Sequence, residues 1–168
     1  MPLERLFAGW RRSYVEGATA AGEADQGCVF CGLSDGPVDD STGVVDLDEL
    51  AFVVLNAYPY GSGHVLVLPR RHVAGIPELT PAESAALWRA TTRALRAIEV
   101  AYAPDGANLG ANLGWAGGAG IPGHLHLHAL PRWGGDTNFM TAVAETRVLP
   151  EDLGDTFVKL RDAFAGLA

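Results

Sequence analysis

The chain has 168 residues, a formal net charge of −8 and an apolar fraction of 48%, a composition typical of a single globular domain with a substantial hydrophobic core. It holds one lysine, Lys159, and its arginines are scattered along the sequence. This argues against binding to a nucleic-acid backbone, which needs a concentrated cationic face. A small anionic ligand is still possible, because backbone N–H groups and a few local cations can hold one.

The sequence also indicates the compartment. Residues 1–7 are too mixed in charge for a secretory signal, and no apolar stretch approaches the length needed to span a membrane. The two cysteines, Cys28 and Cys31, lie three residues apart and do not form a disulfide framework. We therefore expect a cytoplasmic protein in a reducing environment, with no membrane partner.

Residues 1–40 form a lead-in that carries the two cysteines, and five strands are expected after it. Short apolar runs bounded by turn residues predict the strands, and the acidic residues Asp48 and Glu49 mark a hairpin between the first two. The expected strands cover residues 44–47, 51–55, 64–68, 108–113 and 124–130.

Two helices are expected. Thr80 as N-cap, Pro81 at the first helical position and Glu83 three residues after the cap form a capping box. The apolar residues that then recur at helical spacing are Leu87, Ala94, Leu95, Ile98 and Tyr102. Residues 104–106 (Pro-Asp-Gly) end this helix. The spacing of Leu153, Phe157, Leu160 and Phe164 predicts a C-terminal helix. Antiparallel strands with separate helices indicate an α+β fold.

The most informative segment is a row of three histidines, His124, His126 and His128, which alternate with apolar residues. On a strand, all three imidazoles share one face and the apolar residues share the other. Three interpretations follow. The histidines are incidental to a core or surface strand; two or three of them hold a catalytic metal; or one imidazole attacks phosphorus in an ester or anhydride.

The segment before the histidine row favours the third interpretation. Residues 114–123 include five glycines, and a loop of this kind allows backbone N–H groups to approach an anion without interference from Cβ atoms. Alone, the loop is equally consistent with a flexible hairpin. No carboxylate cluster of the kind that a hydrolytic metal site requires lies near the strand. We therefore expect a phosphate ligand beside the histidines.

The Cys28/Cys31 pair has three interpretations: a redox pair, half of a zinc site, or two small buried residues. A redox role requires a thioredoxin-like strand-to-helix setting, which the sequence does not show. A closed structural zinc needs four ligands, and with no other cysteine the remaining two must be histidines. His72 and His124 are the candidates. If zinc binds, His124 is structural and the metal fixes the strand that carries His126.

Several other residues keep two interpretations each. Trp115 and Trp133 either stack on a base or cover the core. Arg70, Arg71 and Arg132 either position phosphates or are solvated ends of strands.

These features resemble the histidine triad (HIT) family, in which histidines alternate with hydrophobic residues. The matching segments are residues 52–56, 63–69, 112–114 and 124–130. The tail over residues 131–140 and the lead-in over residues 6–14, ahead of the cysteines, look like the branch that cleaves diadenosine tetraphosphate. Together the resemblance covers most of residues 5–160. It implies a HIT domain over residues 41–168 after the 1–40 lead-in, as one domain overall, and a homodimer.

The resemblance implies a role for each histidine of the row. His126 corresponds to the nucleophile that forms a nucleotidyl-histidine intermediate, and His128 to the histidine that contacts the α-phosphate and assists the leaving group. A neutral nucleophile needs its other nitrogen to donate to a backbone carbonyl, and an imidazolium at His128 would neutralise phosphoryl charge. Zinc-containing members have a histidine at the positions of both His72 and His124, which implies a structural Zn²⁺ held by Cys28, Cys31, His72 and His124.

The implied substrate-binding residues are Asn56 at the ribose, His64 near the phosphates, Asn112 near the scissile phosphate, and Ala119 and Gly120 in the loop before the histidines. Many relatives have glutamine at the position of Gly120. The small residue leaves room for inorganic phosphate as the acceptor, in place of water.

We therefore expect a nucleotidyl transferase or hydrolase that cleaves diadenosine tetraphosphate or related adenosine polyphosphates, with phosphate or water as acceptor. The partner is a small nucleotide. The alternatives are an adenine-nucleotide-binding protein without catalysis and a HIT enzyme recruited to a biosynthetic phosphoramidate or adenylated substrate.

Overall fold

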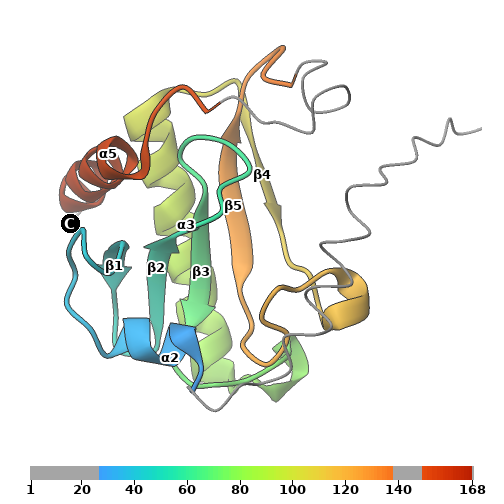
Figure 1. Ribbon diagram of the computed structural model, residues 1–168. Coiled ribbons are helices and arrows are strands. Elements are labelled where there is room, and N and C mark those ends of the chain that lie inside the picture. Colours follow the sequence, from blue (N-terminus) through green and yellow to red (C-terminus); the bar gives the residue numbers. More distant parts are fainter. Residues whose placement is uncertain (1–26, 138–148, 168) are drawn as a thin grey trace, which may run out of the picture.

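A five-stranded antiparallel sheet forms the centre of the protein (Figure 1). The computed structural model describes residues 27–137 and 149–167. The strands lie in the order β1-β2-β3-β5-β4, and their bounds are Val44–Leu47 (β1), Ala51–Leu55 (β2), Val65–Pro69 (β3), Gly106–Gly110 (β4) and Leu127–Arg132 (β5). The expected α+β fold is confirmed.

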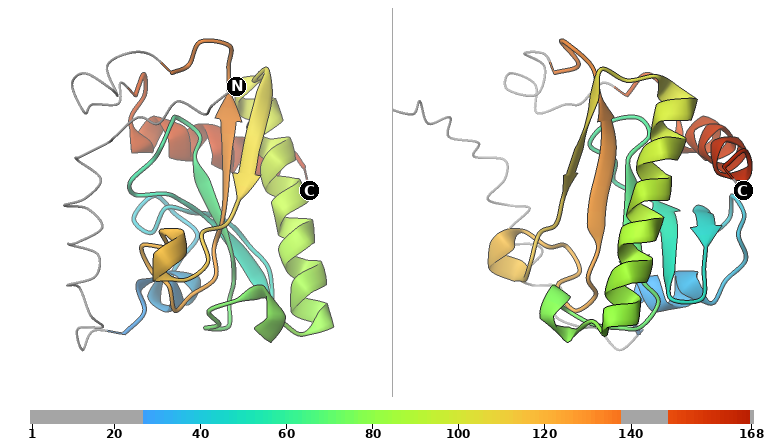
Figure 2. Two further views of the ribbon diagram at one scale, coloured as in Figure 1. Left: turned by 90° about the vertical axis from the view of Figure 1, so that its right-hand side faces the viewer. Right: turned by 180° about the vertical axis from the view of Figure 1, so that it is seen from behind.

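Two helices cover one face of the sheet (Figure 2). The long helix α3 (Pro81–Tyr102) packs on β2, β3 and β5, and α5 (Leu153–Ala165) packs on α3 and β1. Leu125, Leu127 and Ala129 lie in the core beneath α3. The alternation expected for the histidine segment is therefore present, since its apolar residues face α3 and its histidines face the other way.

Helix α3 begins and ends as its sequence predicts. The Glu83 N–H donates to Thr80 Oγ1 (3.2 Å), and the Thr80 N–H donates to Glu83 Oε2 (2.8 Å). The Arg71 guanidinium also donates to both oxygens of the Glu83 carboxylate. The helix ends at Tyr102, where Ala103 takes a left-handed conformation (φ 43°) before Pro104.

The other face of the sheet holds a smaller core and a short helix that was not expected. Helix α2 (Val29–Ser34) begins directly after Cys28, and its Phe30 packs against the second face of the sheet. The sheet residues of this core are Val44, Phe52, Val54, Leu66 and Leu68. The histidine row lies on this face, beside α2. The Phe30 ring of α2 contacts the rings of His124 and His126.

Three of the five strands have limits that differ from those expected. β4 covers Gly106–Gly110 and not 108–113, β5 begins at Leu127 and not at His124, and β3 begins at Val65. His124 and Leu125 precede the ladder because the Leu125 N–H donates to the Val73 carbonyl instead of a strand (2.6 Å). Two short 3₁₀ turns, Ile76–Glu78 and Trp115–Gly117, lie in the connections.

Parts of the expected pattern lie outside the described residues: the lead-in over residues 1–26 and the end of the tail over residues 138–140. Within the described ranges, each helix is too short or too polar to cross a membrane.

Candidate active site and metal centre

A hydrogen bond to the backbone orients the ring of His126. Its Nδ1 lies 2.8 Å from the carbonyl oxygen of His124, and the side chain is 6% exposed. A carbonyl oxygen can only accept a hydrogen bond, so Nδ1 carries the hydrogen. In the neutral imidazole, Nε2 therefore keeps its lone pair, which is the state that a nucleophile requires.

His128 has the opposite tautomer, which a chain of donors imposes. The Tyr60 N–H donates to His64 Nδ1 (3.0 Å), so the hydrogen of His64 lies on Nε2. His64 Nε2 then donates to His128 Nδ1 (3.0 Å). The neutral His128 ring therefore carries its hydrogen on Nε2, and this buried nitrogen has no partner within the described part of the chain.

His128 is neutral in the protein without ligand. Burial, and secondarily the nearby His126, lowers the pKa of His128 to about 4. The buried site thus disfavours the imidazolium expected at this position. A neutral Nε2–H can still donate a hydrogen bond to an oxygen that gains negative charge.

The substrate-binding candidates separate into two groups. Asn112 lines the pocket described below, whereas Asn56, Ala119 and Gly120 do not. Asn56 is buried; its Oδ1 accepts from the Tyr58 N–H (3.0 Å) and its Nδ2 lies 3.3 Å from His64 Nδ1. Its side chain thus holds the turn that leads to His64.

Two cysteines and two histidines meet at the start of α2. Cys28 Sγ lies 3.3 Å from His124 Nδ1, and Cys31 Sγ lies 3.4 Å from His72 Nδ1 and 3.6 Å from His124 Nδ1. The four potential ligand atoms lie within 4.8 Å of one another. Tetrahedral Zn²⁺ with ordinary Zn–S and Zn–N bonds separates sulfur from nitrogen by about 3.6 Å. The four residues named from the sequence therefore fit a zinc ion.

His124 is prepared as a ligand by its second nitrogen. Its Nε2 lies 2.9 Å from the Pro69 carbonyl oxygen, which fixes the hydrogen there and leaves the Nδ1 lone pair toward the cysteines. Burial also lowers the pKa of His124, which favours the neutral ring that a metal needs. His124 thus has two functions: its ring faces the metal site, and its carbonyl group orients His126.

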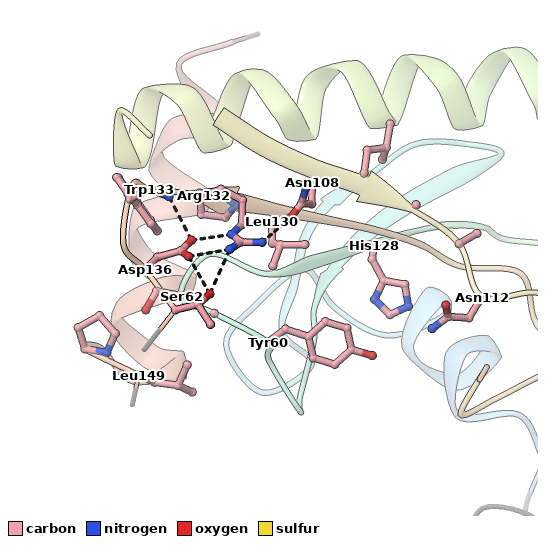
Figure 3. Close-up of a pocket in the computed structure, with 17 residues that line it drawn as sticks. Tyr60, Ser62, Asn108, Asn112, His128, Leu130, Arg132, Trp133, Asp136 and Leu149 are labelled. Atoms are coloured by element: carbon pink, nitrogen blue, oxygen red, sulfur yellow. Dashed lines mark hydrogen bonds and ion pairs between the residues drawn. The ribbon is translucent and has the colours of Figure 1, made fainter. Parts of the chain in front are cut away.

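A pocket of about 710 Å³ opens beside His128 (Figure 3). It extends past Tyr60 to Ser62, Trp133 and the Arg132–Asp136 ion pair. The Arg132 Nε and Nη2 donate to the two Asp136 oxygens (2.5 and 2.6 Å), and Nη1 donates to Asn108 Oδ1 (2.6 Å).

Sequence reasoning missed Ser62, Asn108 and Asp136. The tail motif signalled Asp136 alone, because it contains the arginine and the aspartate four residues apart. Of the two tryptophans left open, Trp133 lines the pocket with its ring edge-on to Tyr102 (6.1 Å between centroids), whereas Trp115 is 68% exposed. Arg70 and Arg71 contact Asp35 and Glu83, away from this pocket.

Comparison with known proteins agrees with this geometry. A family model described as the HIT domain matches residues 39–135. AP-4-A phosphorylase from Mycobacterium tuberculosis is 38% identical over 161 residues, which cover 92% of this chain and 80% of the relative. Protein hit from Bacillus subtilis is 30% identical over 131 residues, covering 76% and 88% of the two chains. Among solved structures, a zinc-bound histidine triad family protein from Mycobacterium smegmatis superposes with a TM-score of 0.67 at 30% identity, covering 86% of this chain and 97% of that one. The chain belongs to the HIT-domain family.

Proposed function

We propose that this protein transfers a nucleotidyl group from diadenosine tetraphosphate, or a related adenosine polyphosphate, through a covalent intermediate on His126. The observation that carries the proposal is the hydrogen bond between His126 Nδ1 and the His124 carbonyl oxygen, because in the neutral ring it places the lone pair on Nε2. The 38% identity to a protein named AP-4-A phosphorylase supports the choice of substrate.

In the first step, the Nε2 lone pair of His126 attacks the α-phosphorus. The N–P bond forms as the bridging P–O bond breaks, and that electron pair leaves with the polyphosphate oxygen. His128 Nε2–H donates a hydrogen bond to this oxygen. Because a polyphosphate leaves as a stable anion, a neutral donor is sufficient and a full proton transfer is not needed.

In the second step, an acceptor oxygen attacks the phosphorus and the N–P electron pair returns to His126. Inorganic phosphate yields ADP, so that the overall products are ADP and ATP, whereas water yields AMP and ATP. We favour phosphate, on the basis of the small Gly120 at a position where many relatives have glutamine and of the relative's name.

We also infer a structural Zn²⁺ on Cys28, Cys31, His72 and His124. Four protein ligands leave no open coordination position, so the ion would supply rigidity to this end of the site and no chemistry on the substrate. The zinc-bound relative supports this inference. Two cysteines that bind a metal and form no disulfide with each other agree with a cytoplasmic location.

We propose a homodimer formed at β4. Gly106–Gly110 is an edge strand, and each of its residues is exposed. Leu109 on this strand and Val100 on α3, the helix that precedes it in the chain, are 43% and 65% exposed. An uncovered edge beside apolar side chains favours pairing with another copy, and sedimentation velocity would measure it. A Leu109→Lys variant should sediment as a monomer.

The test of the reaction is a trapping experiment. Wild-type protein is incubated with diadenosine tetraphosphate labelled at the α-phosphorus and is then denatured in alkali, where phosphoramidates survive. We expect acid-labile label on the peptide that contains His126. His126→Ala should carry none, whereas Ser84→Ala on α3, away from the histidine row, keeps the nucleophile and should still be labelled.

Product chromatography with and without phosphate identifies the acceptor. Phosphate-dependent ADP indicates phosphorolysis, and AMP indicates hydrolysis. Equal nucleotide binding by wild type and His126→Ala, with no turnover by either, would instead indicate a binding protein without catalysis. Turnover limited to phosphoramidates or other adenylated compounds would indicate recruitment to a biosynthetic substrate.

A further inference from the structure

The pocket meets the histidine row at one end only, at His128. Of the three histidines, His128 lines it and His126 does not. In phosphoryl transfer the attacking atom and the leaving oxygen lie roughly in line, on opposite sides of the phosphorus. If His126 attacks and His128 donates to the leaving oxygen, as proposed above, a pocket entered at His128 holds the departing group.

The half of the pocket farther from His128 is lined by Ser62, Asn108, Arg132, Trp133 and Asp136 (Figure 3). We call it the far half, and it does not suit phosphates. Among the described lining residues, Arg132 is the one permanently charged cation, and all three of its guanidinium nitrogens already donate to Asp136 or Asn108. Asp136 adds a carboxylate to the same wall. An incoming polyphosphate would therefore find a paired arginine and a like charge, which provide no net attraction.

The same half suits a nucleoside. The Trp133 side chain provides an aromatic surface, and Leu130 and Leu149 add apolar contact. Uncharged polar groups lie on the same walls: because Asn108 Oδ1 accepts from Arg132, its amide N–H groups are left to donate elsewhere. An apolar cleft with a few oriented polar groups is the usual form of a site for a small organic ligand.

Ser62 is the most specific of these features. Its side chain lines the pocket and is 8% exposed, and its hydroxyl has no hydrogen-bond partner in the part of the chain that the structure describes. Leaving a buried hydroxyl without a partner costs free energy, which a ligand would recover by supplying one. Rotation about the Cα–Cβ bond changes the direction of the oxygen without moving the backbone.

We propose that the far half of this pocket is a subsite for the nucleoside of the leaving nucleotide, and that Ser62 donates a hydrogen bond to it. The proposal rests on the reaction proposed above. It predicts that the protein distinguishes substrates by their leaving groups as well as by the adenylyl group that is transferred. Dinucleoside polyphosphates are then preferred over adenylyl compounds with a small leaving group.

The experiment compares two substrates that share the same adenylyl half: diadenosine tetraphosphate, and adenosine 5′-phosphorimidazolide, whose leaving group is imidazole. Loss of one neutral hydrogen bond in Ser62→Ala should lower kcat/KM for the dinucleotide by about 3- to 10-fold, with the imidazolide unchanged. The matched control is Ser84→Ala on α3, outside the pocket, which should change neither.

Thermal unfolding separates binding from a structural role. Removal of a hydroxyl without a partner should leave Tm unchanged or raise it, whereas a structural hydroxyl would lower it. Equal losses on both substrates, no loss on the dinucleotide, or a lowered Tm would each overturn the proposal.

If wild type turns over neither substrate, the proposed reaction is wrong, and calorimetry judges the subsite separately. Weaker ATP binding by Ser62→Ala, with tripolyphosphate binding unchanged, would support a nucleoside subsite. Equal changes for both ligands would overturn it.

Discussion

Acid should destabilise this protein through His128. The pKa of His128 is about 4 in the folded chain, against an ordinary 6.5, because burial and then His126 disfavour the imidazolium. Between these two values the unfolded chain binds a proton that the folded chain does not, so stability falls as the pH falls through this window. Two-state linkage gives a loss, relative to neutral pH, of about 1 kcal/mol at pH 5.5 and about 2 to 3 kcal/mol at pH 4.5.

Urea unfolding of wild type and His128→Gln at pH 7.5, 5.5 and 4.5, with the same zinc loading, measures this contribution. Glutamine can accept from His64 Nε2 but has no titratable proton, so the variant should lack this part of the pH dependence. Its stability relative to wild type should therefore improve by the amounts above as the pH falls. Parallel pH dependences, within about 0.5 kcal/mol, would show that the His128 ring is not held neutral by burial.

Three further predictions concern the metal and the framework. Cys31→Ser should reduce bound zinc, measured by mass spectrometry, from one ion per chain to none and should lower Tm; retained zinc would place the ion elsewhere. Gly63→Ala should cost about 2 kcal/mol or more in urea unfolding, because φ is +74° there and the new Cβ would lie 2.8 Å from Tyr102 Cε2; an unchanged midpoint would mean that the ring moves aside. Thr80→Ala should cost about 1 kcal/mol through loss of the N-cap, with KM unchanged; an altered KM would connect this cap to the active site.

The parts of the structure that follow local rules were predictable. A period of two places the histidines opposite Leu125 and Leu127, and this holds although the strand assigned there is shorter than expected. The capping box at Thr80 formed as its residue pattern predicts. Counting favoured two histidines as partners of the two cysteines in a closed zinc site, and the family resemblance implied that they are His72 and His124.

The parts that depend on tertiary contacts were not predictable. Helix α2 is six residues long and includes Gly32, so neither periodicity nor propensity indicates it. It forms where Phe30 packs on the sheet. Asn56 likewise carries no sequence signal that its amide would be occupied by the turn before His64. The Arg132–Asp136 pair and the hydroxyl of Ser62 could be assigned to a pocket only from the tertiary structure.

Because His124 would join the proposed zinc to the proposed nucleophile, a metal bound there should also report on the chemistry. The ring of His124 faces the cysteines and its carbonyl group accepts from His126. Replacement of zinc by cobalt(II) in this quartet would give a coloured thiolate centre, whose absorption bands depend on ligand geometry. Adenylylation of His126 would change the hydrogen bond that its Nδ1 donates to the His124 carbonyl group. The absorption spectrum should therefore change at the rate at which the covalent bond forms. The change should reverse when the acceptor breaks that bond.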